Sequence, residues 1–202
     1  MIRAIFFDFY GVWLPDVLAE YLAEAEQLGP QVSDELVVAV NQYYHGEMSL
    51  NDLAGKFKFS MNRPDIDADK LLLDQRNISP AIISFMRELH EHFIKLGVLA
   101  NLGVQEYKLL SDFNETNQVL EVIAGPLPFR SPQPLLSPDI FSQALHAIGE
   151  PPQSCLAVTG NTNYQHFAES LGIQVLPFEG FPKLRETLLA RITSEAQQAN
   201  NA

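Results

Sequence analysis

One carboxylate at the end of an apolar run is the first candidate for chemistry in this chain. Residues 2–7 are apolar except for Arg3, and they lead into Asp8 and then Gly11. A run of this kind is typical of a strand buried on both faces at the centre of a parallel sheet. Because an ionised Asp is costly to bury without a partner, we expect Asp8 at a strand end that opens on a ligand-binding crevice. The alternative is a turn in which Asp8 only bonds nearby backbone amides.

The rest of the sequence predicts the elements that would position Asp8. Apolar residues at helical spacing predict a group of helices directly after the first strand, over 17–27, 33–44, 49–59 and 65–74. Further helices are expected over 80–92, 105–112, 138–148, 163–171 and 181–194. Strands are expected over 95–100, 120–124, 154–158 and 173–176, with a proline-rich loop over 125–138 and a frayed end over 196–202. This alternation predicts an α/β fold with a doubly wound parallel sheet.

Taken together, the segments AIFFDFYGVW, RELHEHFIKLGVLAN and SPDIFSQALHAIGEPPQSCLAVTGN resemble the haloacid dehalogenase superfamily. AIFFDFYGVW resembles its first motif, an apolar strand followed by Asp-x-Asp-Gly-(Thr/Val), and RELHEHFIKLGVLAN resembles the helix and strand that end at its second motif. SPDIFSQALHAIGEPPQSCLAVTGN resembles the helix and strand that span its third and fourth motifs. The resemblance implies a Rossmann-like core over 1–14 and 78–202, with a small helical cap over 15–77 inserted after the first strand. An ordinary helical insertion without a lid role is the alternative.

The resemblance also assigns roles to individual positions. Asp8 matches the family's nucleophile, which forms a covalent aspartyl intermediate. Tyr10 stands where the family carries its general acid–base Asp, so Asp8 and Tyr10 are the candidate catalytic residues. Motif two normally ends its strand with a Ser or Thr that binds a phosphoryl oxygen, whereas this chain has Ala100 followed by Asn101. The positions expected to contact a ligand are Gly11, Asn101, Thr159 and Asn161.

The third and fourth motifs depart further from the family. Motif three normally supplies a Lys that neutralises charge between the nucleophile and the substrate phosphate, but the alignment puts Leu135 there. Arg130, in the proline-rich loop, either replaces that cation or is a solvated loop residue. Motif four normally supplies acidic residues that hold magnesium, and Thr159-Gly160-Asn161 stand in their place.

These replacements predict a weakened catalytic site. Magnesium usually takes one or two carboxylates, so with Asp8 as the sole acidic ligand we expect magnesium to bind weakly at best. A phosphate would face Asp8 with a repulsion of about 4 kcal/mol per charge pair at ~4 Å and an effective dielectric constant near 20. We therefore expect a catalytically impaired pseudoenzyme that binds a small molecule or a protein in the crevice.

A hydrolase that uses Asp8 as its nucleophile is the alternative function. It would be a phosphatase or a 2-haloacid dehalogenase, because those dehalogenases carry Asp-x-Tyr-Gly in motif one and use no metal. They also keep the Ser and Lys that Ala100 and Leu135 replace, and residues 13–59 contain no Arg to hold a substrate carboxylate. Four aromatic residues of the cap are expected in its core: Tyr43, Tyr44, Phe57 and Phe59.

Composition excludes several classes of partner. The net charge of −12 would repel a nucleic-acid backbone. Cys155 is the only cysteine, which excludes an internal disulfide and is expected to be a buried, inert thiol. No run approaches the ~18 apolar residues of a membrane span, so we expect a cytoplasmic protein, with a homodimer possible.

Overall fold

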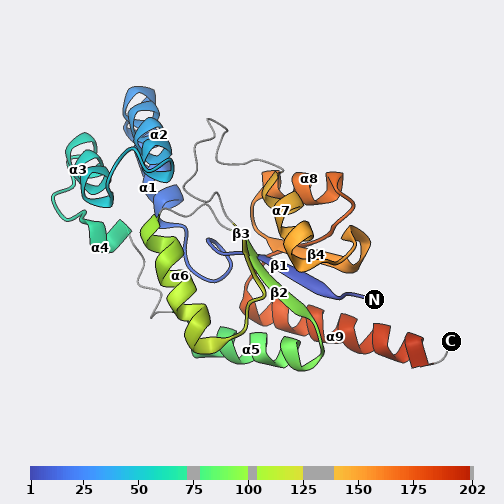
Figure 1. Ribbon diagram of the computed structural model, residues 1–202. Coiled ribbons are helices and arrows are strands. Elements are labelled where there is room, and N and C mark those ends of the chain that lie inside the picture. The colour runs from blue at the N-terminus through green and yellow to red at the C-terminus, as the bar shows by residue number, and fades with distance from the viewer. Residues whose placement is uncertain (72–77, 100–103, 125–138, 201–202) are drawn as a thin grey trace.

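A five-stranded parallel sheet forms the centre of the computed structural model, which describes residues 1–71, 78–99, 104–124 and 139–200 (Figure 1). The strands are β1 (Ala4–Asp8), β2 (Lys95–Leu99), β3 (Val122–Ala124), β4 (Cys155–Thr159) and β5 (Gln174–Pro177). Their order is β3-β2-β1-β4-β5, with β1 in the middle. All five residues of β1 are buried, as expected for a central strand covered on both faces. The Rossmann-like parallel sheet predicted from the sequence is confirmed.

Helices cover both faces of the sheet. The helices on one face are α5 (Pro80–Glu91), α6 (Val104–Asn117) and α9 (Phe181–Asn200), and those on the other are α7 (Asp139–Ile148) and α8 (Thr162–Ser170) (Figure 1). Successive side chains of a strand point to opposite faces, so Ile5 and Phe7 join the first hydrophobic cluster and Ala4 and Phe6 the second. A short 3₁₀ helix, η2 (Pro152–Ser154), precedes β4.

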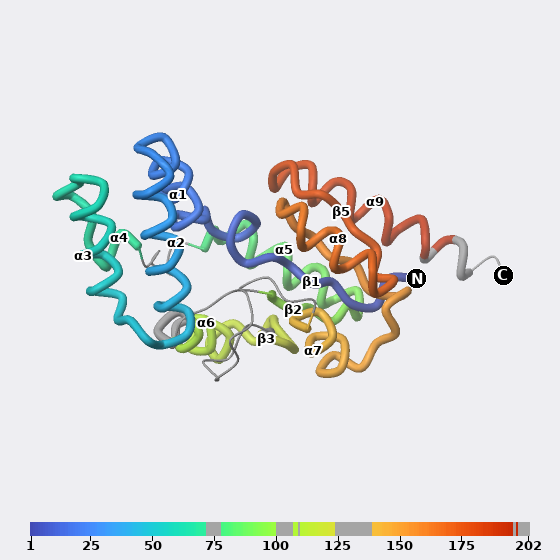
Figure 2. Tube along the Cα trace, turned by 90° about the horizontal axis from the view of Figure 1, so that it is seen from above, coloured from blue at the N-terminus to red at the C-terminus, as the bar shows by residue number. Residues whose placement is uncertain are grey.

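A separate group of helices follows β1 directly. It comprises α1 (Val17–Leu28), α2 (Pro30–Tyr44), α3 (Leu50–Ser60) and α4 (Ala68–Leu71). These helices pack around their own hydrophobic cluster, in which Leu36, Leu53 and Phe57 are fully buried. Figures 1 and 2 both show the group beside the sheet rather than over either of its faces. Because β1 ends at Asp8 and α1 begins at Val17, the group lies next to the strand end that carries Asp8.

Some predicted boundaries and contacts are wrong. Helix α2 begins at Pro30 rather than Ser33, because proline suits the first turn of a helix and Gly29 supplies the preceding positive φ of 122°. Helix α9 continues to Asn200, well into the segment over 196–202 that was expected to fray. Phe59 is 87% exposed although its neighbour Phe57 is fully buried, since residues two apart lie on different faces of a helix.

Other expectations fall outside the described residues. The proline-rich loop over 125–138 and part of the helix expected over 65–74 belong to this group. Within the part of the chain that the structure describes, no helix combines the length and the apolar character needed to cross a lipid bilayer.

Candidate functional site

Asp8 and Thr159 meet at the ends of two neighbouring strands. Asp8 is the last residue of β1 and Thr159 the last of β4, and parallel strands that pair end at the same edge of the sheet. The Thr159 Oγ1 donates a hydrogen bond of 2.8 Å to Asp8 Oδ2. Both residues are buried, with Asp8 7% exposed. No other hydrogen bond from the described residues reaches the Asp8 carboxylate, so its second oxygen, Oδ1, has no donor there.

The direction of that hydrogen bond follows from a second contact. The Asn161 backbone N–H donates to Thr159 Oγ1 over 3.0 Å, so the single hydroxyl proton is free to point at Asp8. Asn161 is also the N-cap of α8, where its Oδ1 accepts from the backbone N–H groups of Asn163 and Tyr164 at 2.9 and 3.3 Å. Thr159 and Asn161 are therefore held in place by the start of α8.

A tight turn after β1 positions Tyr10 and Gly11. The Phe9 carbonyl accepts from the N–H groups of Trp13 and Leu14, and the Gly11 N–H donates to the Leu14 carbonyl over 2.6 Å. Gly11 has a φ of 88°, a conformation that side-chain-bearing residues rarely adopt. The Tyr10 ring packs edge-on against Phe9 with 5.0 Å between ring centroids.

These elements surround one pocket with a volume of about 340 Å³. Its lining comes from the β1 tip, the turn after it, the start of α1, the end of α2 and the start of α8: Asp8, Tyr10, Gly11, Asp16, Tyr44, Gly160, Asn161 and Tyr164. Of the candidate residues, four line this pocket: Asp8, Tyr10, Gly11 and Asn161. Thr159 lies behind Asp8. Four positions named from the motifs lie outside the described residues: Ala100, Asn101, Arg130 and Leu135.

Sequence reasoning missed three side chains that line the pocket, Asp16, Tyr44 and Tyr164. Asp16 is the N-cap of α1, where its Oδ1 accepts from the Ala19 N–H over 3.0 Å. A capping Asp eight residues after the strand-end Asp8 was a signal that could have found it. Tyr164 lies in the first turn of α8, directly after the strand-end motif. Tyr44 carried no such signal, because only the folded position of α2 brings it to the sheet edge.

Burial sets the protonation of the pocket. It raises the pKa of Asp8 to about 7, with the Thr159 hydrogen bond lowering that pKa and the nearby Asp16 carboxylate raising it. Burial also raises the pKa of Asp16, against the hydrogen bond from Ala19. The pKa of Tyr164 rises by burial and by the charges of Asp8 and Asp16. The Tyr164 phenol therefore stays protonated and can act as a hydrogen-bond donor.

The residues present fit a magnesium ion poorly. Thr159 already occupies one oxygen of Asp8, and Ala19 occupies one oxygen of Asp16. Among the residues that the structure describes, no cluster of three His, Cys, Asp or Glu side chains is placed to hold a metal. Magnesium favours octahedral oxygen coordination, often with substrate phosphate as a ligand, and the described pocket lining offers no cation to hold that phosphate.

Comparison with known proteins gives matches at the level of structure. No family model matches the sequence, and neither does any curated protein. A HAD family enzyme from Bacteroides thetaiotaomicron, solved with magnesium and inorganic phosphate, is similar over 88% of this chain and 94% of its own, with a TM-score of 0.56 and 14% identity. A predicted HAD-like family hydrolase from Porphyromonas gingivalis matches over 93% and 98%, with a TM-score of 0.59 and 16% identity.

An L-2-haloacid dehalogenase from Xanthobacter autotrophicus is also similar. It matches over 87% of this chain and 76% of its own, with a TM-score of 0.55 and 17% identity. These solved structures include a phosphate-bound enzyme and a dehalogenase, so the likeness concerns the fold and not one activity. The chain has the α/β fold of the haloacid dehalogenase superfamily, as its sequence motifs predicted.

Proposed function

We propose that this chain is a member of the haloacid dehalogenase superfamily that binds a ligand in its strand-end crevice and lacks efficient metal-dependent phosphatase activity. The observation that carries the proposal is the 2.8 Å hydrogen bond from Thr159 to Asp8. By the resemblance, the segment that begins at Thr159 is where the family holds magnesium with acidic side chains. Here Thr159 brings a hydroxyl to that position, which supplies a hydrogen-bond donor to Asp8 in place of a further carboxylate ligand.

The protonation of Asp8 supports the same conclusion. With a pKa of about 7, Asp8 is close to half protonated at neutral pH. A protonated carboxyl group is neither a good nucleophile nor a good metal ligand. A bound cation would lower this pKa, and no described residue of the pocket lining is a Lys, Arg or His.

The charge of the pocket also disfavours a phosphate ester. Asp8 and Asp16 both line it, and each ionised carboxylate at ~4 Å would repel a phosphate charge by about 4 kcal/mol at an effective dielectric constant near 20. Tyr44 reaches the same pocket from α2. We therefore propose that α1–α4 act as a cap that closes over the bound ligand.

A hydrolase is the second candidate, and the position of Asp16 favours it. Asp8 lies at the strand tip beside a pocket, where it could attack a substrate, and Asp16 places a second desolvated carboxylate in that pocket. A carboxylate pair of this kind can divide the roles of nucleophile and general base. Tyr10 fits a metal-free dehalogenase, by the resemblance of motif one.

Turnover of the full chain tests the choice between these functions. Wild type, Asp8→Asn and the matched control Asp34→Asn, which changes an exposed residue of α2, are assayed with phosphate monoesters and with 2-haloacids, with and without magnesium. We expect no turnover above that of Asp8→Asn. Turnover that needs magnesium and disappears in Asp8→Asn, but not in Asp34→Asn, would refute the proposal and support a hydrolase.

A further inference from the structure

Two carboxylates and three tyrosine side chains line this pocket and define the chemistry that it can recognise. Building on the ligand-binding role proposed above, on which the idea rests, we infer that the ligand is a small protonated amine held by Asp8 and Asp16. This charge is opposite to that of a phosphate ester or a haloacid.

Each carboxylate keeps one oxygen for a ligand. Thr159 donates to Oδ2 of Asp8 at 2.8 Å, and the Ala19 N–H donates to Oδ1 of Asp16 at 3.0 Å. In the described part of the chain, no further donor bonds either carboxylate. Both residues line the pocket, so a ligand with two or more N–H groups can supply the missing donors. A protonated amine has such donors, whereas a quaternary ammonium ion has none.

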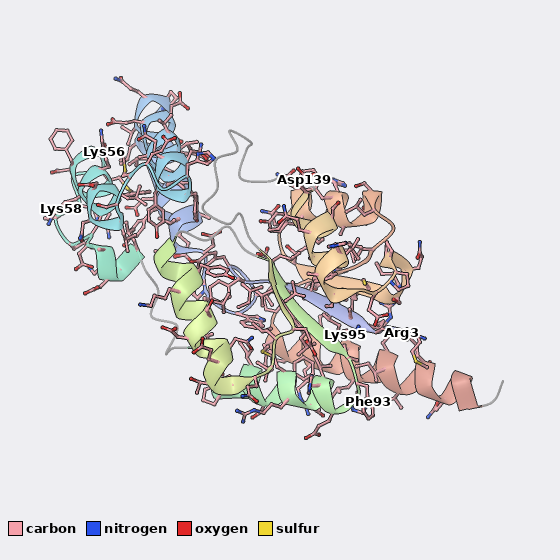
Figure 3. All side chains as sticks on the ribbon, viewed as in Figure 1. Arg3, Lys56, Lys58, Phe93, Lys95 and Asp139 are labelled. Carbon is pink, nitrogen blue, oxygen red and sulfur yellow. The ribbon has the colours of Figure 1, made fainter. Side chains whose placement is uncertain are left out.

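No cationic side chain of the described pocket lining would compete with such a ligand for the two carboxylates. That lining contains no Lys, Arg or His. Figure 3 shows Arg3 and Lys95 at the far end of the strands from α1–α4, where each forms an ion pair with Glu150. Lys56 lies on α3 and pairs with Glu35 at 3.0 Å (Figure 3). The net charge of −12 further favours the approach of cations over anions.

Tyr164 gives independent evidence that the pocket is built for a polar ligand. Its side chain is 3% exposed and lines the pocket, and its ring packs edge-on against Phe141 at 5.8 Å between centroids. Its hydroxyl has no hydrogen-bond partner among the described residues. The hydroxyl is not among the fully enclosed side-chain atoms without a partner, and Tyr164 lines the pocket, so its O–H is available to a ligand atom that accepts a hydrogen bond.

Aromatic rings form much of the remaining wall. Tyr10 and Tyr44 line the pocket together with Tyr164, and aromatic faces attract ammonium groups through cation–π interactions. The volume of about 340 Å³ suits a small molecule. An amine that also carries a hydroxyl or ether oxygen would match both the carboxylates and the unpaired Tyr164 hydroxyl.

Matched probes test the charge preference. Isothermal titration of the full chain is performed with benzylamine, benzyl alcohol, benzoate and tetramethylammonium, and with inorganic phosphate. Solutions are kept at about pH 8, above the Asp8 pKa of about 7, so that Asp8 is largely ionised. We expect benzylamine to bind at least about tenfold more tightly than benzyl alcohol, because hydrogen bonds to charged groups are strong. Benzoate and phosphate should show no binding.

Two variants localise the binding. Asp16→Asn removes one charge and keeps the N-cap of α1, because Asn and Asp cap helices equally well. It should weaken benzylamine binding at least about tenfold. The probe 2-amino-1-phenylethanol, which adds a hydroxyl to the amine, should bind more tightly than benzylamine to wild type and lose that advantage in Tyr164→Phe. Asp34→Asn, the exposed control on α2, should leave all affinities unchanged.

The outcomes separate this inference from the proposed function. If benzoate or phosphate binds and benzylamine does not, or if Asp16→Asn binds benzylamine as wild type does, the amine assignment is wrong. Tighter binding of tetramethylammonium than of benzylamine would also contradict it, because the N–H donors would then be irrelevant. Failure of the amine assignment without turnover leaves the ligand-binding role intact. Magnesium-dependent turnover would refute that role whatever binds.

Discussion

Asp8 should destabilise the folded protein at neutral pH, and the substitution Asp8→Asn exposes that cost. In the folded chain the Asp8 pKa is raised from 3.8 to about 7, chiefly by burial. The native state therefore holds this proton between about pH 4 and pH 7, where the unfolded state has released it. Because the native state binds more protons in this range, the free energy of unfolding falls as the pH rises from 4 to 7 and levels off above 7.

The size of this fall follows from the two pKa values. At about 1.4 kcal/mol for each pH unit between 3.8 and about 7, ionised Asp8 costs the fold about 4 kcal/mol. Asn has nearly the same shape and cannot ionise. Its amide oxygen can accept the hydrogen bond that Thr159 donates at 2.8 Å in the wild type. Asp8→Asn should therefore gain stability relative to wild type as the pH rises, by up to about 4 kcal/mol between pH 4 and pH 8.

Urea denaturation at several values between about pH 4 and pH 8 measures this difference. Asp16, whose pKa burial also raises, is present in both proteins, so its contribution largely cancels. Asp34→Asn serves as the control, because it removes an exposed carboxylate on α2 that lies outside the pocket. A difference between Asp8→Asn and wild type that does not grow from pH 4 to pH 8 would show that the folded structure does not desolvate this carboxylate.

Two further substitutions test the hydrogen bond at the strand end and the turn at the other end of the sheet. Thr159→Val removes the donor to Asp8 and the acceptor of the Asn161 N–H. It should lower the free energy of unfolding by about 1–3 kcal/mol and raise the Asp8 pKa above about 7. Urea denaturation at several pH values measures both effects. Phe93→Gly should stabilise the protein by about 1 kcal/mol, measured as a higher thermal midpoint. Phe93, which is labelled in Figure 3, is 94% exposed and has a φ of 59°. An unchanged midpoint would mean that this left-handed backbone carries no cost.

The sheet was predictable because its central strands are short apolar runs that can be recognised from the local sequence. The run from Ala4 to Phe7 is apolar and ends in a single carboxylate, and β4 is a similar run of buried residues. The starts of α5 and α3 were also predictable, because Ser79 and Ser49 are residues that commonly cap the N-terminus of a helix. The start of α2 was misplaced because Pro30 is compatible both with a loop between two helices and with the first position of a helix. Whether the helix begins at this proline depends on whether the residues after it pack into a hydrophobic cluster, which is a property of the fold.

The pocket was only partly predictable for a related reason. Asp8 and Asn161 follow strands that end at one edge, so their proximity is a consequence of topology. Tyr44 reaches the pocket from the far end of α2, and no periodic pattern states which residue of that helix faces the sheet. The prediction that Tyr43 and Tyr44 belong to the core of the helical group is correct, since both side chains are buried. Burial and pocket lining are compatible for Tyr44, and the sequence alone could not separate them.

By the resemblance of the first motif, Asp8 corresponds to the family's nucleophile, and the described pocket lining holds it without a Lys, Arg or His. In the superfamily that Asp is expected to face metal and lysine charges, and losing those charges would leave an ionised carboxylate unpaired at a buried position. Here Thr159 donates to it, and its pKa of about 7 lets it take up a proton at little cost near neutral pH. Asp16 then adds a second negative charge instead of a compensating positive one. A cation from outside would stabilise the ionised carboxylates of such a site, so the ligand itself would supply the positive charge that the described lining lacks.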